Sequence, residues 1–248
     1  MASGYLSSHM LPLIISVDFD TTLAMAVPRR PRAPRMDPAQ RRRLLVRAAL
    51  RAAGRRSLAA VTAEDVAREA GVSRAAVFKY FPDRDALISA VLGEVERNVR
   101  ERTDRVRAST SDPVRLLVNL SVAYAASLDT DFETAMVVLS WSAFYREPKI
   151  VAPLGRLFVE FVTLVEDTIR NGIRQKKIPE DIDIELAAWT FVGYSATVAA
   201  AKFFGRPPEW IYHLQIALLR NLFGHRAVDR VLAGTKPEPL TSDRLKTT

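Results

Sequence analysis

The 248-residue sequence contains no cysteine. A chain without thiols has no disulfide framework, no cysteine-ligated zinc site and no thiol nucleophile, and it suits the reducing cytoplasm. Its three histidines, His9, His213 and His225, form no HExxH pattern, and the chain carries neither a phosphate-binding glycine loop nor a nucleophile elbow. The sequence therefore predicts a cytoplasmic protein that is not an enzyme, with no metal site and no cofactor.

A long uninterrupted apolar run is also missing. The run at 11–17 is broken by Pro12 and precedes the first positive charges, which is the reverse of a signal peptide. The charge-free stretch 186–201 is 16 residues long, short of the ~20 that cross a bilayer. We therefore expect no membrane partner, and we treat residues 1–35 as a disordered or non-native N-terminal extension outside the fold.

Positive charge is concentrated near the N-terminus. The net charge is +8, and residues 28–107 hold 20 Lys and Arg against 10 Asp and Glu, whereas the rest of the chain holds 16 against 18. A basic third joined to a near-neutral remainder indicates one module that meets a polyanion and a second module with another task. Solvated arginines on helix faces give the same composition, so composition alone leaves both interpretations open.

Apolar residues recur at helical spacing almost throughout the chain from Pro38, and no stretch alternates with the period of a strand. The pattern predicts an all-α fold, beginning with a helix that ends at Gly54. Helices are then expected from Thr62 to Ala70, from Ser73 to a stop at Pro82, and from Asp83 onward. Breaks rich in proline, glycine and acidic residues predict five more, near 113–128, 132–145, 150–175, 183–204 and 208–223.

The segment 62–81 has the organisation of a helix-turn-helix. Thr62 and Asp65 have the spacing of a capping box at the start of its first helix. Gly71 supplies the positive φ that a tight turn between helices requires. Val77 and Phe81 are placed to close a small core behind the second helix.

The front of that second helix is thin and ringed by hydrogen-bond donors. Ala75 and Ala76 leave it narrow enough to enter a DNA major groove about 12 Å wide. Around them stand side chains that can reach phosphates or base edges: Ser73, Arg74, Lys79 and Tyr80. The segment predicts binding to double-stranded DNA. The alternative is a buried helical hairpin in which these residues merely pack.

This segment resembles the helix-turn-helix of the TetR family over about 50 residues. The residues that carry the likeness are Ala67-x-x-Ala70-Gly71-Val72-Ser73-x-x-x-Val77-Phe78-x-Tyr80-Phe81-x-x-Arg84-Asp85-x-Leu87. The resemblance implies a three-helix DNA-binding domain over 36–84 and a helical effector-binding and dimerisation domain over 85–224, followed by a flexible tail over 225–248. It also implies phosphate contacts from Thr62, Ser73, Phe78, Tyr80 and Arg84, and base contacts from Arg74, Ala75 and Lys79.

Three departures from the family pattern matter. Phe78 stands where the family usually has tyrosine and lacks the hydroxyl for a phosphate. Ala75 replaces a frequent glycine, so that its methyl group can meet a thymine methyl. The loop from Gly54 to Thr62 is longer than usual.

Ahead of the motif lie four arginines, Arg29, Arg30, Arg32 and Arg35. They are either a disordered arm for the minor groove or unstructured residues without a role.

The second domain is rich in aromatic residues. In the TetR family, which this sequence resembles, this region binds an inducer between helices. We therefore predict a pocket for an apolar or amphiphilic small molecule here. The alternative is plain core, which is the more common role of an aromatic stripe at helical spacing. The candidate ligand-binding residues are Tyr124, Trp141, Phe144, Tyr145, Phe158, Phe161 and Tyr194. The helices near 183–204 and 208–223 are expected to form a four-helix interface in a homodimer.

The sequence thus predicts a ligand-responsive regulator, a repressor, that binds a near-palindromic operator. A constitutive or architectural DNA-binding dimer without an effector is the alternative. A helical enzyme with a vestigial DNA module is disfavoured, because the sequence holds no catalytic constellation.

Overall fold

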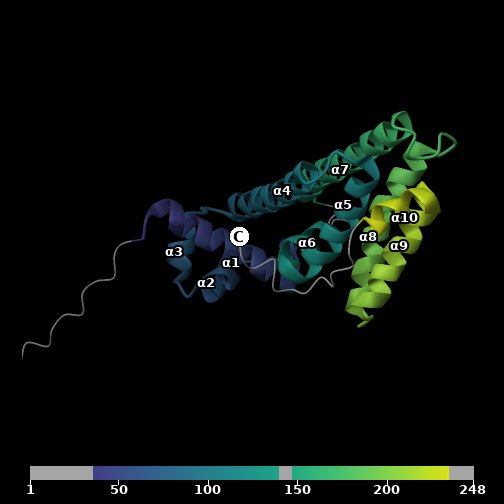
Figure 1. Cartoon of the computed structure of the whole chain (residues 1–248). Coiled ribbons are helices and arrows are strands. Elements are labelled where there is room, and N and C mark those ends of the chain that lie inside the picture. Colours follow the sequence, from purple (N-terminus) through teal and green to yellow (C-terminus); the bar gives the residue numbers. More distant parts are fainter. Residues whose placement is uncertain (1–35, 140–146, 235–248) are drawn as a thin grey trace, which may run out of the picture. The chain divides into compact units, whose positions relative to one another are not determined.

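Three helices at the start of the described chain lie together (Figure 1), and their apolar side chains belong to a core that residues of three later helices also enter. The first three helices are α1 (Pro38–Arg55), α2 (Ala63–Ala70) and α3 (Arg74–Phe78), with a single 3-10 turn, η1 (Leu58–Ala60), before α2. Leu45, Val66 and Val77 have no exposed surface, and Phe81 closes the core behind α3. The structure is a computed structural model that describes residues 36–139 and 147–234.

Seven further helices follow, and within the described ranges there is no strand. They are α4 (Arg84–Ala108), α5 (Pro113–Thr130), α6 (Phe132–Leu139), α7 (Pro148–Arg174), α8 (Ile184–Phe203), α9 (Pro208–Phe223) and α10 (His225–Ala233). Their second core is centred on Leu117, Val165, Ile169, Leu219 and Phe223. The all-α architecture, with an N-terminal helix-turn-helix and a C-terminal helical domain, is confirmed.

Local signals explain where most of these helices begin. Asp112 caps α5 by accepting the backbone N–H of Arg115 at 2.9 Å, and Pro113 occupies the first turn, where its missing N–H costs nothing. Asp183 caps α8 in the same way through the N–H of Leu186. Each of these capping signals spans only four residues, so it can be recognised in the sequence. The predicted helices therefore lie close to the observed ones.

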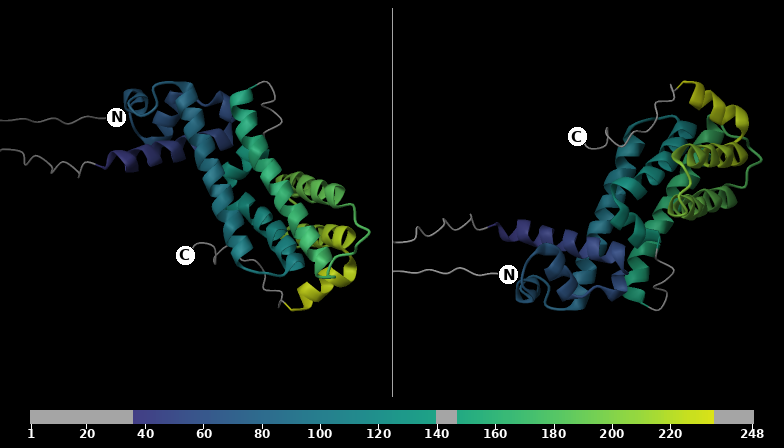
Figure 2. Two further views of the ribbon diagram at one scale, coloured as in Figure 1. Left: turned by 90° about the horizontal axis from the view of Figure 1, so that it is seen from above. Right: turned by 90° about the horizontal axis from the view of Figure 1, so that it is seen from below.

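Helix α4 belongs to both cores. Leu87, Val91 and Val95 are buried with α1–α3, whereas Val106 packs against the second core. Helices α4 and α7 lie side by side, as both views of Figure 2 show. The 25-residue α4 therefore connects the helix-turn-helix mechanically to the remaining helices.

Gly54 does not end the first helix as predicted. It lies inside the last turn of α1, which continues to Arg55. A Cβ atom on Gly54 would stand 2.9 Å from the Cα of Glu133 in α6, closer than carbon atoms approach. The glycine is there because two backbones pass each other, a reason that the local sequence does not reveal.

The tail predicted to be flexible from residue 225 is wrong for its first nine residues. They form α10, which packs on α9 and α5, and Val228 is fully buried. Arg115 donates to the backbone carbonyl oxygen of Val231 at 3.0 Å. The helix is short and amphipathic, and its buried stripe of two valines is easily missed among charged residues.

One helix end also differs from the prediction. Helix α3 ends at Phe78 and not at Pro82, because the next turn tightens: the Tyr80 N–H donates to the Val77 carbonyl three residues back. Residues before a proline disfavour the helical conformation, and Phe81 turns into the core. Helix α6 is described as far as Leu139, and the rest of the predicted helix 132–145 lies outside the described residues.

Candidate nucleic-acid interface and helical pocket

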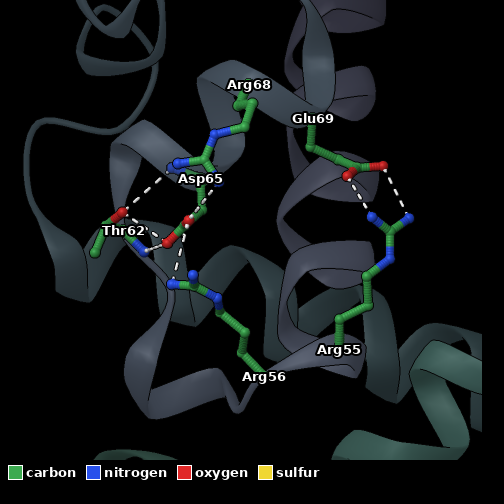
Figure 3. A network of polar contacts seen from close by, with 6 residues as sticks. All are labelled: Arg55, Arg56, Thr62, Asp65, Arg68 and Glu69. Atoms are coloured by element: carbon green, nitrogen blue, oxygen red, sulfur yellow. Dashed lines mark hydrogen bonds and ion pairs between the residues drawn. The ribbon is translucent and has the colours of Figure 1, made fainter.

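The start of α2 is held by the predicted capping box. The Thr62 hydroxyl accepts the Asp65 N–H at 3.2 Å, and Asp65 Oδ2 accepts the Thr62 N–H at 3.2 Å. The hydroxyl also donates to Asp65 Oδ2 at 2.7 Å, as Figure 3 shows. This hydrogen bond lowers the pKa of Asp65 below its ordinary value, with help from the Thr62 N–H and two arginines.

Those two arginines neutralise a nearly buried carboxylate. Arg56 and Arg68 place their Nη1 atoms 3.5 and 3.3 Å from Asp65 Oδ1 (Figure 3). Two cations around one anion offset its charge, so that the aspartate at the start of α2 does not by itself repel an approaching phosphate.

The orientation of α2 on α1 is set by a second set of ion pairs. Glu69 accepts from Arg51 Nε at 2.7 Å and from Arg55 Nη1 at 3.0 Å. The Arg51 bond is the main reason why the pKa of Glu69 is lowered. The pairs are partly exposed, so that their worth lies more in fixing geometry than in stability.

The turn and the short helix α3 have the geometry that the motif predicts. Gly71 is left-handed with φ 65°, and its N–H and that of Val72 bond the last carbonyls of α2. Ser73 caps α3 by accepting the Ala76 N–H at 3.2 Å. Val77 faces the core, which leaves the opposite face of α3 for solvent.

That opposite face carries the predicted base-reading residues. Arg74, Ala75 and Lys79 are all exposed. Phe78, 41% exposed, lies beneath the Arg74 guanidinium at 5.2 Å from ring centre to Cζ. The aromatic ring that replaces a phosphate-binding tyrosine therefore supports an arginine by a cation–π contact.

The predicted phosphate contacts are less uniform. Ser73 and Phe78 are exposed, whereas Tyr80 is half-buried against the core. Thr62 is exposed, but its hydroxyl proton is directed at Asp65. Arg84 donates to the Ala59 carbonyl oxygen at 2.6 Å and lies 3.4 Å from Glu147 Oε2. For Thr62 and Arg84, a phosphate contact therefore requires exchange of an existing partner.

The contact between Arg84 and Glu147 was not foreseen. It joins the start of α4 to the residue that precedes α7, and a neighbouring pair, Asp85 with Lys149, links the same two ends. The partners are more than 60 residues apart, and single charges in a sequence do not indicate such a pairing. The sequence also does not indicate that Arg56 and Arg68 pair with Asp65, because arginines at such positions are usually solvated.

The second domain encloses an apolar cavity of about 480 Å³. Tyr124, Phe158 and Phe161 line it, as predicted. Tyr194, also predicted, is not among the lining residues: α8 lines the cavity with residues 189, 192, 193, 195 and 196, and Tyr194 packs on a neighbouring cluster. Trp141, Phe144 and Tyr145 lie outside the described residues.

Other residues of the cavity were missed by the sequence analysis. Trp189 closes one side, with its ring 5.2 Å from that of Phe158. Helix α4 contributes Val99, Arg102 and Val106. Aromatic content was the signal used, and it does not detect aliphatic residues that helix packing turns toward a cavity.

A surface of exposed apolar side chains runs along α8 and α9. Its described members are Leu186, Trp189, Phe203, Phe204, Trp210 and Tyr212, and Phe203 is 86% exposed. Between them α8 presents Gly193, where an added Cβ would meet nothing within 4 Å. Large apolar surfaces of this kind mark contact sites.

Comparison with known proteins agrees with this geometry. The model of the family "Bacterial regulatory proteins, tetR family" matches residues 45–91, which span the helix-turn-helix and the start of α4. The HTH-type transcriptional regulator BetI of Agrobacterium fabrum is 31% identical over 141 residues, which cover 57% of this chain and 67% of that protein. The chain belongs to the TetR family.

Solved TetR-family structures share the fold at low identity. A TetR-family transcriptional regulator from Agrobacterium tumefaciens superposes with a TM-score of 0.65 at 14% identity, covering 75% of this chain and all of that one. AibR, in complex with isovaleryl coenzyme A and operator DNA, gives a TM-score of 0.59 at 17% identity, with 74% and 98% covered. At these identities the likeness concerns the fold alone.

Two further tests concern ions and membranes. In the described part of the chain, no three His, Asp or Glu residues are grouped to hold a metal ion. Among the same residues, Ile184–Phe203 is long and apolar enough to cross a membrane by length and composition, and 33% of its apolar window is buried in the protein. The core helix of a soluble protein passes the same test, and one such helix is weak evidence for a membrane.

Proposed function

We propose that this TetR-family protein is a ligand-responsive transcriptional repressor. It binds a near-palindromic operator as a homodimer and is released by an apolar or amphiphilic small molecule. One observation carries the proposal: a single long helix, α4, begins beside the exposed recognition helix and lines the apolar cavity farther along. Binding at the cavity can thereby alter the placement of the DNA-reading helix.

In this proposal α3 enters the major groove. Arg74, Ala75 and Lys79 contact base edges, and their exposure on the face opposite Val77 supports this. Ser73, Phe78 and Tyr80 contact phosphates, together with Thr62 and Arg84 after they exchange partners. The two arginines that pair with Asp65 offset its repulsion of the DNA backbone.

The homodimer uses α8 and α9. Their exposed apolar residues form the surface described above, and α8 is free of charge from 186 to 201. Packing the same surface of two chains together buries it and generates the two-fold axis that a near-palindrome requires. Two recognition helices then lie about one DNA turn apart. The protein works in the cytoplasm, where its DNA is.

The effector occupies the cavity lined by Tyr124, Phe158 and Phe161. It binds more tightly to the state in which the two recognition helices have the wrong separation, and so it shifts the population away from DNA. AibR, which shares this fold, is described in complex with both a small molecule and operator DNA.

Selection of bound DNA from a random library, followed by fluorescence anisotropy on the selected site, tests the proposal. We expect a two-fold sequence and release by small molecules that bind the cavity. Bound DNA without sequence preference would support an architectural protein. Sequence-specific binding that no cavity ligand weakens would support a constitutive regulator.

A further inference from the structure

The cavity of the second domain contains one polar group whose hydrogen bond is missing. The Tyr124 hydroxyl is buried and has no hydrogen-bond partner among the described residues. A buried hydroxyl without a partner is unfavourable and is rare in folded proteins. Because Tyr124 lines the cavity, a bound molecule can supply the missing partner.

Neighbouring hydroxyls already have hydrogen-bond partners elsewhere. Ser195 donates to the Val192 carbonyl oxygen at 2.6 Å, and Ser127 donates to the carbonyl oxygen of Tyr124 itself at 2.7 Å. Thr134 accepts from the side-chain amide of Asn98 at 3.1 Å. Burial raises the pKa of Tyr124 to about 12; the Ser195 hydroxyl, which lies near the phenol but outside hydrogen-bond geometry, opposes the shift. The phenol therefore stays protonated near neutral pH and remains a donor.

Charge in the cavity is balanced before a ligand arrives. Arg102 lines the cavity, and its Nη2 atom lies 2.6 Å from Asp131 Oδ2. Both side chains are about three-quarters buried, with 23% and 24% exposed. A charged ligand would have to break this pair or lose its hydration without compensation, and both are costly.

We infer that the effector is an uncharged, largely apolar molecule with a carbonyl or other acceptor oxygen that takes the hydrogen bond of Tyr124. The inference rests on the proposed effector role of the cavity and narrows its ligand class. Tyr124 selects for the oxygen, the balanced Arg102–Asp131 pair selects against charge, and the aromatic walls at Phe158, Phe161 and Trp189 accept the apolar part.

Four molecules of similar shape test this inference: 4-phenylbutan-2-one, butylbenzene, 4-phenylbutanoate and 4-phenylbutylamine. Their affinities are measured on the full chain by tryptophan fluorescence, since Trp189 lines the cavity, and by thermal shift. We expect the ketone to bind about fivefold more tightly than the hydrocarbon, the effect of one hydrogen bond. The two charged compounds should bind at least about tenfold more weakly than the ketone.

Two matched variants locate the effect. Tyr124→Phe should abolish the preference for the ketone over butylbenzene and leave the affinity for butylbenzene unchanged or higher. Tyr194→Phe removes another buried hydroxyl without a partner among the described residues, but one outside the cavity lining, and should keep the preference. Equal preference in wild type and Tyr124→Phe would overturn the role of the phenol.

If 4-phenylbutanoate bound most tightly and lost this affinity in the Arg102→Gln variant, the inference would be overturned in favour of an anionic ligand. Binding of none of the four compounds would also overturn it. Measuring DNA affinity on the same preparations shows whether the inference alone has failed or the proposed function has failed with it. A protein that binds its selected operator but prefers the anion remains a ligand-responsive repressor with another ligand class.

Discussion

At the scale of single residues, the helix-turn-helix depends on side chains that serve local structure and surface chemistry together. Thr62 is the clearest case, because its one hydroxyl caps α2 and also holds the carboxylate of Asp65. Phe78 is another, since it lies on the exposed face and supports the guanidinium of Arg74. Each can be tested by changing one functional group.

Replacing Thr62 by valine should lower the free energy of unfolding by about 1 kcal/mol, the usual cost of a lost N-cap. Thr62→Ser keeps the oxygen and should stay close to wild type. The pKa of Asp65 is lowered mainly by this hydroxyl. The stabilisation is therefore present above the ordinary value of 3.8 and is lost as pH falls below it. Urea unfolding at about pH 6 and about pH 3 should show a valine penalty that shrinks in acid.

Replacing Phe78 by tyrosine should raise DNA affinity about fivefold, because the added hydroxyl can donate to a phosphate. The ring is exposed, so the hydroxyl needs no rearrangement of the core. Phe78→Leu removes the support for Arg74 and should weaken binding and reduce discrimination at the base that Arg74 contacts. Anisotropy on the selected operator and on single-base variants measures both. Weaker binding by the tyrosine variant would place position 78 away from the backbone.

At the scale of elements, signals within a few residues predicted most helix limits. Contacts between segments that lie far apart in the sequence could not be predicted from such signals. The prediction 208–223 coincides with α9, since proline begins that helix and glycine ends it. The role of Gly54 depends on α6, nearly 80 residues away, and the lining residues of α4 depend on which neighbours it meets. The helix-turn-helix site could be predicted because its residues are contiguous in the sequence. The cavity could be predicted only in part, because it is assembled from five helices.

A pair of glycine substitutions tests the contact of α1 with α6. Gly54→Ala should lower the free energy of unfolding by about 1–3 kcal/mol, because its methyl group meets the backbone of Glu133. Gly93→Ala, in α4, meets nothing within 4 Å and should raise it by about 0.5–1 kcal/mol through helix propensity. Stabilisation by both alanines in urea unfolding would show that α1 and α6 can separate freely. Since α6 also lines the cavity through Thr134 and Ala135, Gly54→Ala should further weaken ligand-induced release of DNA.

At the scale of the whole molecule, the proposal needs two functions to be joined through symmetry. One chain presents one recognition helix, and a basic N-terminal third gives it affinity for any DNA. Sequence selectivity over a full operator requires two such helices held at one separation, so the surface of α8 and α9 is as important for DNA binding as α3. Leu186 lies within that surface and is 64% exposed in one chain. Unlike Trp189 and Gly193, it does not line the cavity.

Introducing a charge at this position, as Leu186→Arg, should therefore produce a folded monomer. In a homodimer each arginine would meet the partner's apolar surface without a counter-charge, a desolvation cost that the interface cannot offset. Sedimentation velocity should show half the wild-type mass, and affinity for the selected operator should fall by about 10²-fold or more, because the second half-site is no longer tethered. Gly93→Arg places the same charge in open space on α4 and should remain dimeric. A dimeric Leu186→Arg variant with wild-type operator affinity would move the interface away from α8.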